Sequence, residues 1–470
     1  MKLLKDLVSC DSDIEIINVT SDSRKVTKGT LFVAEKGFFT DHIDFIDQAI
    51  ENGASAAIVE KKVDKDIYQV EVKDVNKEFI NILEKFNDKD TWEFNLIGIT
   101  GTDGKTTTAT ILKQILNNYN STAYIGTNGV ESDHFNKTTN NTTPIPEELY
   151  PLLKQLNDLK CKNIVLEVAS EALLHKRVDN LEFKYGIFTN LTEDHLNIHG
   201  TLENYIESKK HLFDLVKENS IVNIDDEVGK EIFKEHNNTI SYGLSEEADY
   251  RITNIDMVLG KTTFDIIHDK EIYNFETSLI GIYNIYNLTA AIVVALLEGI
   301  KKEELQEIIK SIKVIKGRSE ELKFNTNYKI ILDYAHTAKA IENILAAIKM
   351  YPHKRIISLT GSAGGREKKK RKLMGKACLE NSDLVVFTMD DPRNESVDEI
   401  IDQLIGDSKK TNYVRINDRT EAIKYALDNA KEGDIVAILG KGRDNYMAIG
   451  DEKVPYCDYD VIKEYFDKKS

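Results

Sequence analysis

The sequence predicts an α/β protein of three domains, the central one built on a mostly parallel sheet. Short apolar runs alternate with stretches of helical periodicity, which is typical of parallel sheets covered by helices. A polar stretch at Asn87–Glu93 interrupts this alternation, and the pattern restarts after Arg318. A strand, a glycine-rich turn and a helix follow one another in Phe94–Thr108. With 470 residues, the chain is long enough for several domains, which we place at residues 1–92, 93–317 and 318–470.

Each predicted domain has its own set of elements. The N-terminal domain is expected to hold two strands and one helix, at Gly29–Ala34, Ser55–Glu60 and Ile43–Asn52. The central domain is expected to hold strands at Phe94–Thr100, Ile164–Glu167, Tyr185–Thr189 and Ser220–Ile224. For the C-terminal domain we predict strands at Tyr328–Leu332, Arg355–Leu359, Leu384–Met389 and Asp434–Leu439, and helices at Ala338–Met350, Lys372–Glu380, Val397–Leu404 and Thr420–Asn429. This second alternation predicts a Rossmann-like, doubly wound domain.

The composition excludes several classes of protein. The formal net charge is −17, and a field of this sign repels nucleic acid polymers and anionic membranes. The four cysteines, at positions 10, 161, 378 and 457, form no C-x-x-C pair, which favours a reducing compartment over a disulfide framework or a zinc site. No apolar run is long enough to span a bilayer, and the first residues lack the core of a signal peptide. We therefore expect a cytoplasmic protein, and a monomer.

The segment G-I-T-G-T-D-G-K-T-T-T predicts a nucleotide phosphate site. Gly101 and Gly104 allow the backbone to turn and to approach a ligand closely. Lys105 supplies a positive charge for phosphate oxygens, and Thr106 or Thr107 supplies a hydroxyl for a metal ion. Apolar residues at helical spacing follow, so the N–H groups of a helix N-terminus would point at the anion. The general pattern has glycine where this chain has isoleucine 99, and the alternative is a glycine-rich turn with a solvated lysine.

Polar side chains stand where other predicted strands end. Glu167 closes one strand, and the segment containing Asp194–His199 follows another. Ligands of open α/β sheets bind beyond the carboxyl ends of the strands. We therefore expect Glu167, Asp194–His199 and the turn at Gly101 to converge on one crevice.

The loop T-G-T-D-G-K-T-T and the downstream N-L-T-E-D-H-L-N-I-H-G resemble the Mur ligases, ATP-dependent amide-forming enzymes of bacterial peptidoglycan precursor synthesis. The resemblance extends over almost the whole chain, through D-S-R-K-V, N-T-T-P, L-E-V-A-S-E-A-L, H-G-T-L-E-N-Y, G-I-Y-N-I-Y-N, L-D-Y-A-H-T, D-D-P-R-N-E and G-K-G-R-D in that order. It implies a uridine-nucleotide domain, a central ATP-binding domain and a C-terminal domain for the incoming amino acid. The D-S-R segment resembles members that add a diamino acid to UDP-N-acetylmuramoyl-L-alanyl-D-glutamate.

The resemblance also implies a chemistry and a set of metal ligands. A D-glutamate carboxylate would attack the γ-phosphate of ATP, and the amine would displace phosphate from the resulting acyl phosphate. Magnesium is implied, with ligands from Thr106, Glu167, His195 and a lysine carbamylated by carbon dioxide. The catalytic residues implied are Lys105, Glu167, His195 and Lys209.

Periodicity selects the carbamylated lysine from the two in Y-I-E-S-K-K-H-L-F. Lys209 lies near the centre of an apolar helical stripe, while Lys210 lies about a quarter turn away; the stripe comprises Leu202, Tyr205, Ile206, Phe213 and Val216. An inward lysine is desolvated and loses its proton more easily, as carbamylation requires. The alternative is a lysine that passes along the core toward solvent.

The resemblance implies further contacts with ATP and with the other substrates. Contacts with ATP are implied for Gly101, Thr102, Gly104, Lys105, Thr106, Thr107, Asn284, Asn287, Arg318 and Asp333, with His336 in the same segment as Asp333. Contacts with the sugar-peptide and the amino acid are implied for Ser23, Arg24, His42, Thr142, Thr143, Ser170, Arg177, Arg366, Asp391, Arg393, Gly440 and Asp444.

The incoming amino acid is expected to be meso-diaminopimelate rather than L-lysine. Diaminopimelate carries a distal carboxylate that lysine lacks, and arginine binds carboxylates in bidentate fashion. Arg366 and Arg393 suit that carboxylate. Against it, Asp391 stands where the diaminopimelate pattern D-N-P-R has asparagine, and its negative charge favours an ammonium group.

Other departures from the family pattern leave alternatives open. Ala169 and Glu171 replace a serine and a histidine, and Asp103 replaces the usual asparagine. The segment G-K-G-R-D stands where G-K-G-H-E is usual. The alternatives are a paralogue or related ligase acting on another carboxylate, of folylpolyglutamate or cyanophycin type, and a non-catalytic nucleotide-binding homologue.

Overall fold

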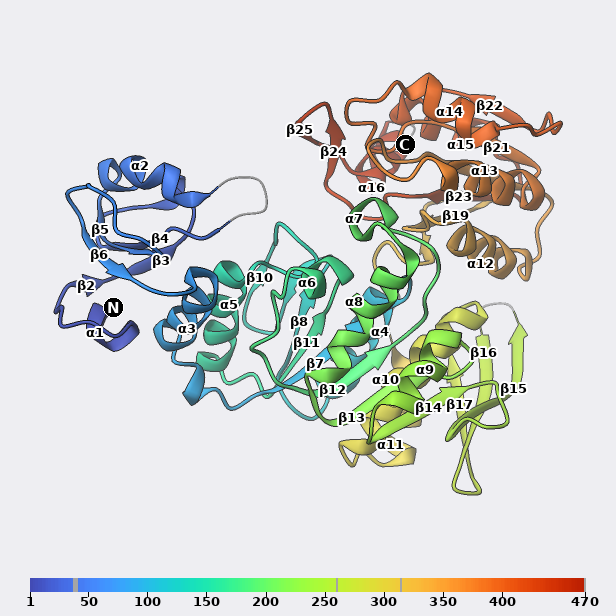
Figure 1. Cartoon of the computed structure of the whole chain (residues 1–470). Coiled ribbons are helices and arrows are strands. Elements are labelled where there is room, and N and C mark those ends of the chain that lie inside the picture. Colours follow the sequence, from blue (N-terminus) through green and yellow to red (C-terminus); the bar gives the residue numbers. More distant parts are fainter. Residues whose placement is uncertain (37–40, 259–260, 313–314, 469–470) are drawn as a thin grey trace. The chain divides into compact units, whose positions relative to one another are not determined.

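The computed structural model describes residues 1–36, 41–258, 261–312 and 315–468 (Figure 1). The chain forms two compact units. The first consists of Met1–Leu96, Asn120–Val168 and Ala172–Glu182, and the second of Ile97–Tyr119, Ala169–Glu171 and Phe183–Ser470. Among the described residues, no helix combines the length and the apolar character needed to cross a bilayer.

The first unit contains a small parallel sheet in the order β3-β4-β5-β6. Its strands are Asn18–Thr20, Thr30–Val33, Ala54–Val59 and Tyr68–Glu71. One face buries Phe32, Ala57 and Val59 with residues of α2 (Ile46–Glu51). The predicted helix at Ile43–Asn52 begins as a 3₁₀ turn, His42–Phe45, a frequent start for an α-helix.

The same unit contains further strands in the order β10-β9-β8-β11, at Asn136–Lys137, Gly129–Glu131, Thr122–Gly126 and Asn163–Glu167. Helix α3 (Val75–Phe86) packs against α5 (Pro146–Asp158). Glu147, in the first turn of α5, accepts hydrogen bonds from the Thr20 hydroxyl at 2.7 Å and the Ser21 N–H at 3.1 Å. These bonds attach the small parallel sheet to α5.

The second unit begins its larger sheet with β7 and continues in the order β7-β12-β13-β14-β15-β16-β17. The strands are Asn95–Thr100, Phe183–Phe188, Val216–Asn223, Thr239–Gly243, Tyr250–Val258, Lys261–His268 and Glu271–Thr277. The pairs from β7 to β15 are parallel, and β15-β16-β17 is an antiparallel meander. The helices of this part include α4 (Lys105–Leu116), α8 (Leu202–Asp214), α9 (Glu227–Glu235), α10 (Ile282–Leu297) and α11 (Lys302–Ser311).

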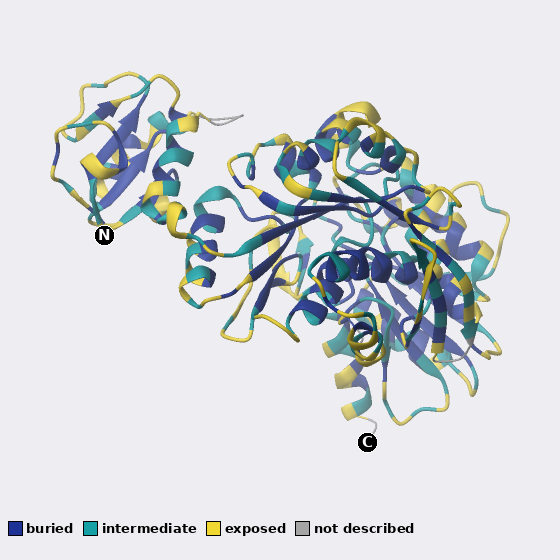
Figure 2. Ribbon diagram, turned by 90° about the horizontal axis from the view of Figure 1, so that it is seen from below, coloured by how far each residue is buried: buried dark blue, intermediate teal, exposed yellow. Residues whose placement is uncertain are grey.

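Helix α10 is mostly apolar, is buried over most of its length and packs against α4, and Asn284 and Asn287 lie in its first two turns. Figure 2 shows buried residues concentrated in the strands and in the helix faces turned toward them, with exposed residues mainly in loops. Because β7, β12, β13 and β14 run parallel, their carboxyl ends lie at one edge of the sheet, together with the turn that follows β7.

The C-terminal sheet of the second unit has the order β18-β19-β23-β20-β21-β22. Its strands are Glu320–Leu322, Lys329–Asp333, Ile435–Leu439, Ile356–Thr360, Leu384–Phe387 and Tyr413–Arg415. All pairs are parallel except β18 with β19. Helices α12 (Ala338–Lys349), α13 (Lys369–Asn381) and α14 (Val397–Ile405) bury one face, and α15 (Arg419–Asn429) and α16 (Asp458–Asp467) bury the other. The doubly wound prediction is confirmed.

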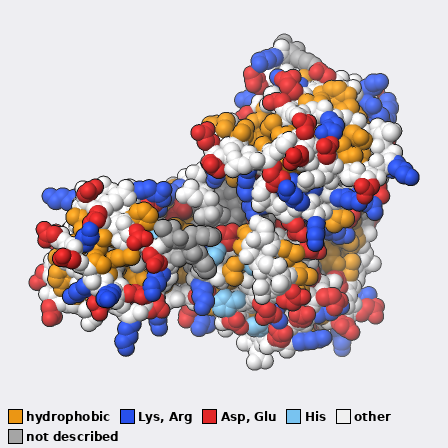
Figure 3. All heavy atoms as spheres, turned by 45° about the horizontal axis from the view of Figure 1, so that its top comes forward, with side chains coloured by type: hydrophobic (Ala, Val, Ile, Leu, Met, Phe, Trp, Pro, Cys, Tyr) orange, Lys and Arg blue, Asp and Glu red, His pale blue; other side chains and the backbone are white. Residues whose placement is uncertain are grey.

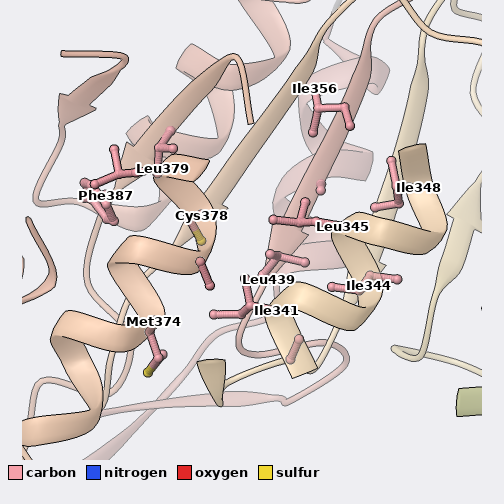
Figure 4. Close-up of a cluster of buried hydrophobic side chains, with 14 of the residues drawn as sticks. Ile341, Ile344, Leu345, Ile348, Ile356, Met374, Cys378, Leu379, Phe387 and Leu439 are labelled. Carbon is pink, nitrogen blue, oxygen red and sulfur yellow. The ribbon is translucent and has the colours of Figure 1, made fainter. Parts of the chain in front are cut away.

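Figure 4 shows how α12 and α13 fill one side of this core. Ile341, Leu345 and Ile348 of α12 face the same cluster as Met374 and Cys378 of α13. These side chains recur at three- and four-residue spacing, so one stripe of each helix is apolar.

A salt bridge joins α13 to the D-D-P-R-N-E segment. Buried Arg371 donates to Glu395 at 2.8 Å and 3.2 Å and to the Ala363 carbonyl at 2.9 Å. The hydrogen bonds from Arg371 lower the pKa of Glu395 from 4.5 to about 2. The carboxylate therefore contributes stability that is complete above pH 4.5 and is lost as the pH falls toward 2.

We expect Glu395→Gln to lower the free energy of unfolding by about 2–3 kcal/mol at pH 7, because it leaves the Arg371 charge buried without its partner. Urea unfolding of both proteins between pH 7 and pH 3.5 measures this difference, which should shrink below pH 4.5. Exposed Glu432 provides the control, Glu432→Gln, with little effect. A difference that does not change with pH would contradict the assignment.

Figure 3 shows Lys and Arg side chains scattered among Asp and Glu over the visible face. Among the residues described there, no continuous basic patch of the kind found on nucleic-acid-binding proteins is visible.

Candidate active site

The turn between β7 and α4, which we call the phosphate turn (Gly101–Gly104), brings the backbone close to two neighbouring elements. Gly101 has φ +145° and Gly104 has φ +87°. A Cβ on Gly101 would lie 1.9 Å from the Thr189 hydroxyl, and one on Gly104 would lie 2.5 Å from Asn287 Oδ1. Only glycine fits at either position, because a side chain would be strained at Gly104 and would collide at both.

Helix α4 begins at Lys105. The N-cap residue of the helix is Gly104, which has no side chain to cap the N–H groups of the first turn. The Lys105 ammonium donates to the Gly101 and Thr102 carbonyls at 2.8 Å and 2.9 Å. A helix N-terminus, a glycine turn and a lysine together form a positive site suited to phosphate groups.

The predicted ATP contacts Arg318, Asn284 and Asn287 lie against this turn. Arg318 stacks on the Tyr334 ring, 4.4 Å from its centroid, and donates to the Thr106 hydroxyl at 3.1 Å. Asn287 accepts from the Thr108 hydroxyl at 3.2 Å and lies 3.4 Å from Asn284. Thr107, the next residue of α4, is buried.

Asp333 lies at the carboxyl end of β19 and is buried. It accepts from the backbone N–H groups of Ser319 at 2.6 Å and Ala335 at 2.7 Å. Burial raises the pKa of Asp333, although the Arg318 charge opposes this. The carboxylate therefore holds the segment that carries Arg318.

Lys209 lies on the buried face of α8, with 1% of its surface exposed, whereas Lys210 forms ion pairs with Glu207, Glu231 and Glu235. The prediction that Lys209 is the inward lysine is confirmed. Its ammonium donates to the Gly101 carbonyl at 2.7 Å and lies 4.6 Å from the centroid of the Tyr205 ring. Burial, with the charge of Lys105, lowers the pKa of Lys209 well below its ordinary value.

The ends of the predicted apolar stripe around Lys209 are wrong. Leu202 is exposed, because it lies at the start of α8. Val216 belongs to β13, because the helix ends at Asp214.

His195 has left-handed backbone, with φ +58°, and its Nε2 lies 3.7 Å from buried Asp194. Burial lowers the pKa of His195, and nearby cations lower it further against the charge of Asp194. A neutral imidazole can act as a metal ligand. Asp194 in turn lies 3.1 Å from Lys370 and 4.0 Å from His336. Burial raises the pKa of Asp194, but the charge of Lys370 contributes most to lowering it overall.

Glu167 lies in the first unit, at the carboxyl end of β11, and is completely buried. It accepts from the Thr127 N–H at 3.1 Å, from the Thr127 hydroxyl at 3.2 Å and from the Tyr124 hydroxyl. The Thr143 hydroxyl donates to the Glu167 carbonyl at 2.8 Å, and Arg177 donates to the Thr143 carbonyl at 3.3 Å. Thr142 lies 3.3 Å from the Thr127 hydroxyl, so four predicted residues form one cluster.

The other predicted residues of this unit lie near the small parallel sheet. Ser23 donates to Gln48 at 2.6 Å. Arg24 is exposed and pairs with Asp22 at 2.8 Å. The ring of His42 contacts that of Phe45, and buried His42 Nδ1 has no hydrogen-bond partner among the residues that the structure describes.

A second group of predicted residues surrounds buried Lys441, in the C-terminal part of the second unit. The Lys441 ammonium lies 2.8 Å from Asp391 and 3.7 Å from Asp444. Burial raises the pKa of Asp444 to about 6, although Lys441 opposes this. Gly440 has φ +113° and would place a Cβ 2.4 Å from Asp390.

Arg393, after Asp391, has left-handed backbone with φ +51° and bonds through its N–H to the Ala448 carbonyl at 3.0 Å. Arg366 is half-buried and is one of the cations that lower the pKa of His195. Ser170 bonds His199 at 3.0 Å.

Three family models match consecutive parts of the chain. Residues 15–88 match the Mur ligase family catalytic domain, residues 99–295 the Mur ligase middle domain, and residues 317–442 the Mur ligase glutamate ligase domain. The chain belongs to the Mur ligase family. The three matches agree with the predicted number of domains.

Similar proteins support this membership over nearly the full length. A UDP-N-acetylmuramoyl-L-alanyl-D-glutamate–2,6-diaminopimelate ligase from Clostridium acetobutylicum is 37% identical, covering 98% of this chain and 96% of that protein. The ligase of the same name from Aquifex aeolicus is 39% identical, covering 95% and 92%. A solved structure of a ligase with this name has a TM-score of 0.70 at 27% identity, covering 100% and 99%. The MurF ligase from Thermotoga maritima in complex with ADP has a TM-score of 0.69 at 22% identity, covering 97% and 99%, and shows the shared fold.

Sequence reasoning missed several residues of this Mur ligase site. Lys370, which pairs with Asp194, lies in the run K-K-K-R, where nothing in the pattern separates it from its neighbours. Asn190 accepts from the Asp103 N–H at 3.0 Å and donates to the Asp103 carbonyl at 3.0 Å. The Tyr205 hydroxyl lies 3.1 Å from the Thr102 hydroxyl. Tyr205 was assigned only to the apolar stripe, because periodicity does not report what a phenol oxygen contacts.

Among the described residues, no group of three or more His, Cys, Asp or Glu side chains is arranged to hold a metal ion. The predicted magnesium ligands do not require such a group, since they include the Thr106 hydroxyl and a modified Lys209. Hard cations such as magnesium prefer oxygen ligands. Thr106 and a carbamylated Lys209 would supply oxygens, so the residues present fit the ion.

Proposed function

We propose that this Mur ligase joins a diamino acid to UDP-N-acetylmuramoyl-L-alanyl-D-glutamate and converts ATP to ADP and phosphate. The observation that carries the proposal is the match, over more than nine-tenths of both chains, to relatives named for this reaction with diaminopimelate. The proposed domains are 1–92 for the UDP-sugar, 93–317 for ATP and 318–470 for the amino acid. We also propose that the enzyme is a monomer and acts in the cytoplasm, where ATP is available.

The reaction we propose has two steps. A carboxylate oxygen of the D-glutamate residue attacks the γ-phosphorus of ATP; a new O–P bond forms, the bond to the β-phosphate bridging oxygen breaks, and ADP leaves. The amine nitrogen then attacks the acyl carbon; a C–N bond forms, the C–O bond to phosphate breaks, and the nitrogen loses its proton.

The chain's own residues serve mainly to position and neutralise charge, which is the larger part of catalysis in phosphoryl transfer. The α4 N-terminus and Lys105 would hold the β- and γ-phosphates. Arg318, stacked on Tyr334 and 3.1 Å from the Thr106 hydroxyl, would add a second cation. In the second unit, Thr106, His195 and carbamylated Lys209 would hold magnesium, which would supply positive charge against the phosphates when bound.

The surroundings of Asp391 support diaminopimelate as the amino acid. The Asp391 carboxylate receives the Lys441 ammonium at 2.8 Å and the Ala448 N–H at 2.9 Å. Lys441 also lies 3.9 Å from Asp390 and 3.7 Å from Asp444, so it offsets only part of the negative charge of Asp391. This partial offset reduces the objection that aspartate at this position repels a distal carboxylate. Arg393 or Arg366 would bind that carboxylate.

An amino-acid panel tests the proposed function. Phosphate release is measured with ATP, purified UDP-N-acetylmuramoyl-L-alanyl-D-glutamate and one amino acid at a time. We expect turnover with meso-diaminopimelate and a kcat/KM for L-lysine lower by at least about a hundredfold, because the arginine left without a carboxylate partner loses a charge-assisted bidentate pair. Turnover with neither amino acid would reject the function, and a preference for lysine would reject the arginine assignment.

A further inference from the structure

Arg443 is one of the two residues by which the segment G-K-G-R-D departs from the family pattern, which has histidine at this position. Its guanidinium donates to Glu320 through Nε at 2.9 Å and through Nη2 at 2.5 Å. The same guanidinium lies 3.5 Å from the centroid of the Tyr459 ring, on α16. A bidentate pair that also stacks on an aromatic ring has one well-defined geometry, and both partners are largely buried, with side-chain exposures of 23% and 13%.

Glu320 connects Arg443 to the segment that carries Arg318. The Gly317 N–H donates to Glu320 Oε2 at 2.7 Å, and that oxygen also receives Nε of Arg443. Gly317 has φ +71°, and a Cβ there would lie 2.8 Å from the Arg443 nitrogen. The backbones of Gly317 and Arg443 are therefore in contact, and the Glu320 carboxylate bonds to both residues. Gly317 and Glu320 flank Arg318 in the sequence.

The two connected segments serve different substrates in the proposed reaction. Gly317–Glu320 contains Arg318, which donates a hydrogen bond to the Thr106 hydroxyl beside the phosphate turn. Gly440–Asp444 carries Lys441 and Asp444, which face Asp391, where the amino acid is proposed to bind. A histidine at position 443 has neither the length nor the fork of donors to make the bidentate pair.

We propose that Arg443 is a positioning residue that couples the amino-acid loop Gly440–Asp444 to Arg318, and so to the nucleotide. The coupling rests on the proposed function for the identity of the amino acid. The effect of Arg443 on nucleotide binding does not depend on that identity. Arg443 touches no reacting atom. It acts by holding Arg318 where the guanidinium reaches the phosphate turn.

The test is a double-mutant cycle read out by nucleotide binding. The affinity of the full-length protein for a fluorescent ATP analogue is measured without sugar-peptide or amino acid, in wild type, Arg443→Met, Arg318→Ala and the double variant. We expect Arg443→Met and Arg318→Ala each to weaken binding at least tenfold. The double variant should match Arg318→Ala, because Arg443 acts through Arg318.

Two further variants separate positioning from folding. Arg443→Lys keeps the positive charge but loses the bidentate geometry, and this variant should weaken nucleotide binding at least threefold. It takes the place of Arg443→Met in the cycle if the Arg443→Met protein does not fold. Arg415→Met is the matched control, because Arg415, on β22 of the C-terminal sheet, makes an exposed ion pair with Asp402 of α14 at 2.7 Å. This variant should bind the nucleotide like wild type.

Three results would overturn the proposal: wild-type affinity in a folded Arg443 variant, wild-type affinity in Arg318→Ala, or effects that multiply in the double variant. Because binding is measured without the other substrates, a wild-type protein that ligates no amino acid would count against the proposed function alone.

Discussion

Lys209→Ala is expected to lower the rate of ligation by at least about a hundredfold while leaving the fold intact. Lys209 is fully buried, donates to the Gly101 carbonyl at 2.7 Å and has a lowered pKa. A neutral amine can attack carbon dioxide; the N–C bond forms, one proton leaves, and the carbamate gains the negative oxygens that a magnesium ion requires. Alanine removes that ligand, and phosphate release with all three substrates measures the loss.

Rescue separates the carbamate from a purely structural lysine. Short-chain carboxylates such as acetate should restore part of the activity of Lys209→Ala, since they supply the missing oxygens. Lys210→Ala is the matched control on the next position of α8, where the ammonium pairs with surface glutamates, and it should remain within about twofold of wild type. Full activity in Lys209→Ala would remove the assignment, and a loss without rescue would argue for a packing role.

Lys105→Ala is expected to reduce ATP turnover by about 10²–10³-fold, because it deletes the cation at the N-terminus of α4 that faces the transferred phosphate. The ammonium is half-buried and donates to two backbone carbonyls of its own turn at 2.8 Å and 2.9 Å, which water can satisfy once the side chain is removed. Stability should therefore change little. Phosphate release and thermal unfolding measure the two effects separately.

Lys113→Ala provides the comparison for Lys105→Ala, since Lys113 lies on the same helix and is partly exposed. It should show wild-type turnover. Equal turnover in the two variants would place the phosphate groups elsewhere. A large fall in the unfolding temperature of Lys105→Ala would show that the lysine serves the fold.

Local pattern was sufficient wherever a single element decides the outcome. The apolar run before Gly101, the glycines and the helical spacing after Lys105 predict a strand, a turn and a helix, and β7 and α4 follow. Two neighbouring lysines on α8 could be told apart, because helical geometry alone determines which of them faces inward. Four strands and four helices of the C-terminal domain were likewise predicted, because each has an apolar stripe or run of the right period. The short edge strands β18 and β22 and the helix α16 were not predicted.

Contacts between distant segments could not be predicted in this way. The pairing of Lys370 with Asp194, the bidentate bond between Arg443 and Glu320, and the compensation of Asp391 by Lys441 each join residues at least 50 positions apart. The antiparallel meander β15–β17 also went unrecognised, since alternation within a strand does not say which neighbour it pairs with.

Local sequence specifies the alternation of strands and helices, the phosphate turn and the inward lysine, because each depends on the conformation of a few consecutive residues. Packing between distant segments sets which charges meet, and therefore which carboxylates have a cationic partner and which arginine reaches the turn. Burial and ion pairing depend on the packing of segments far apart in the chain, and no local period encodes that packing.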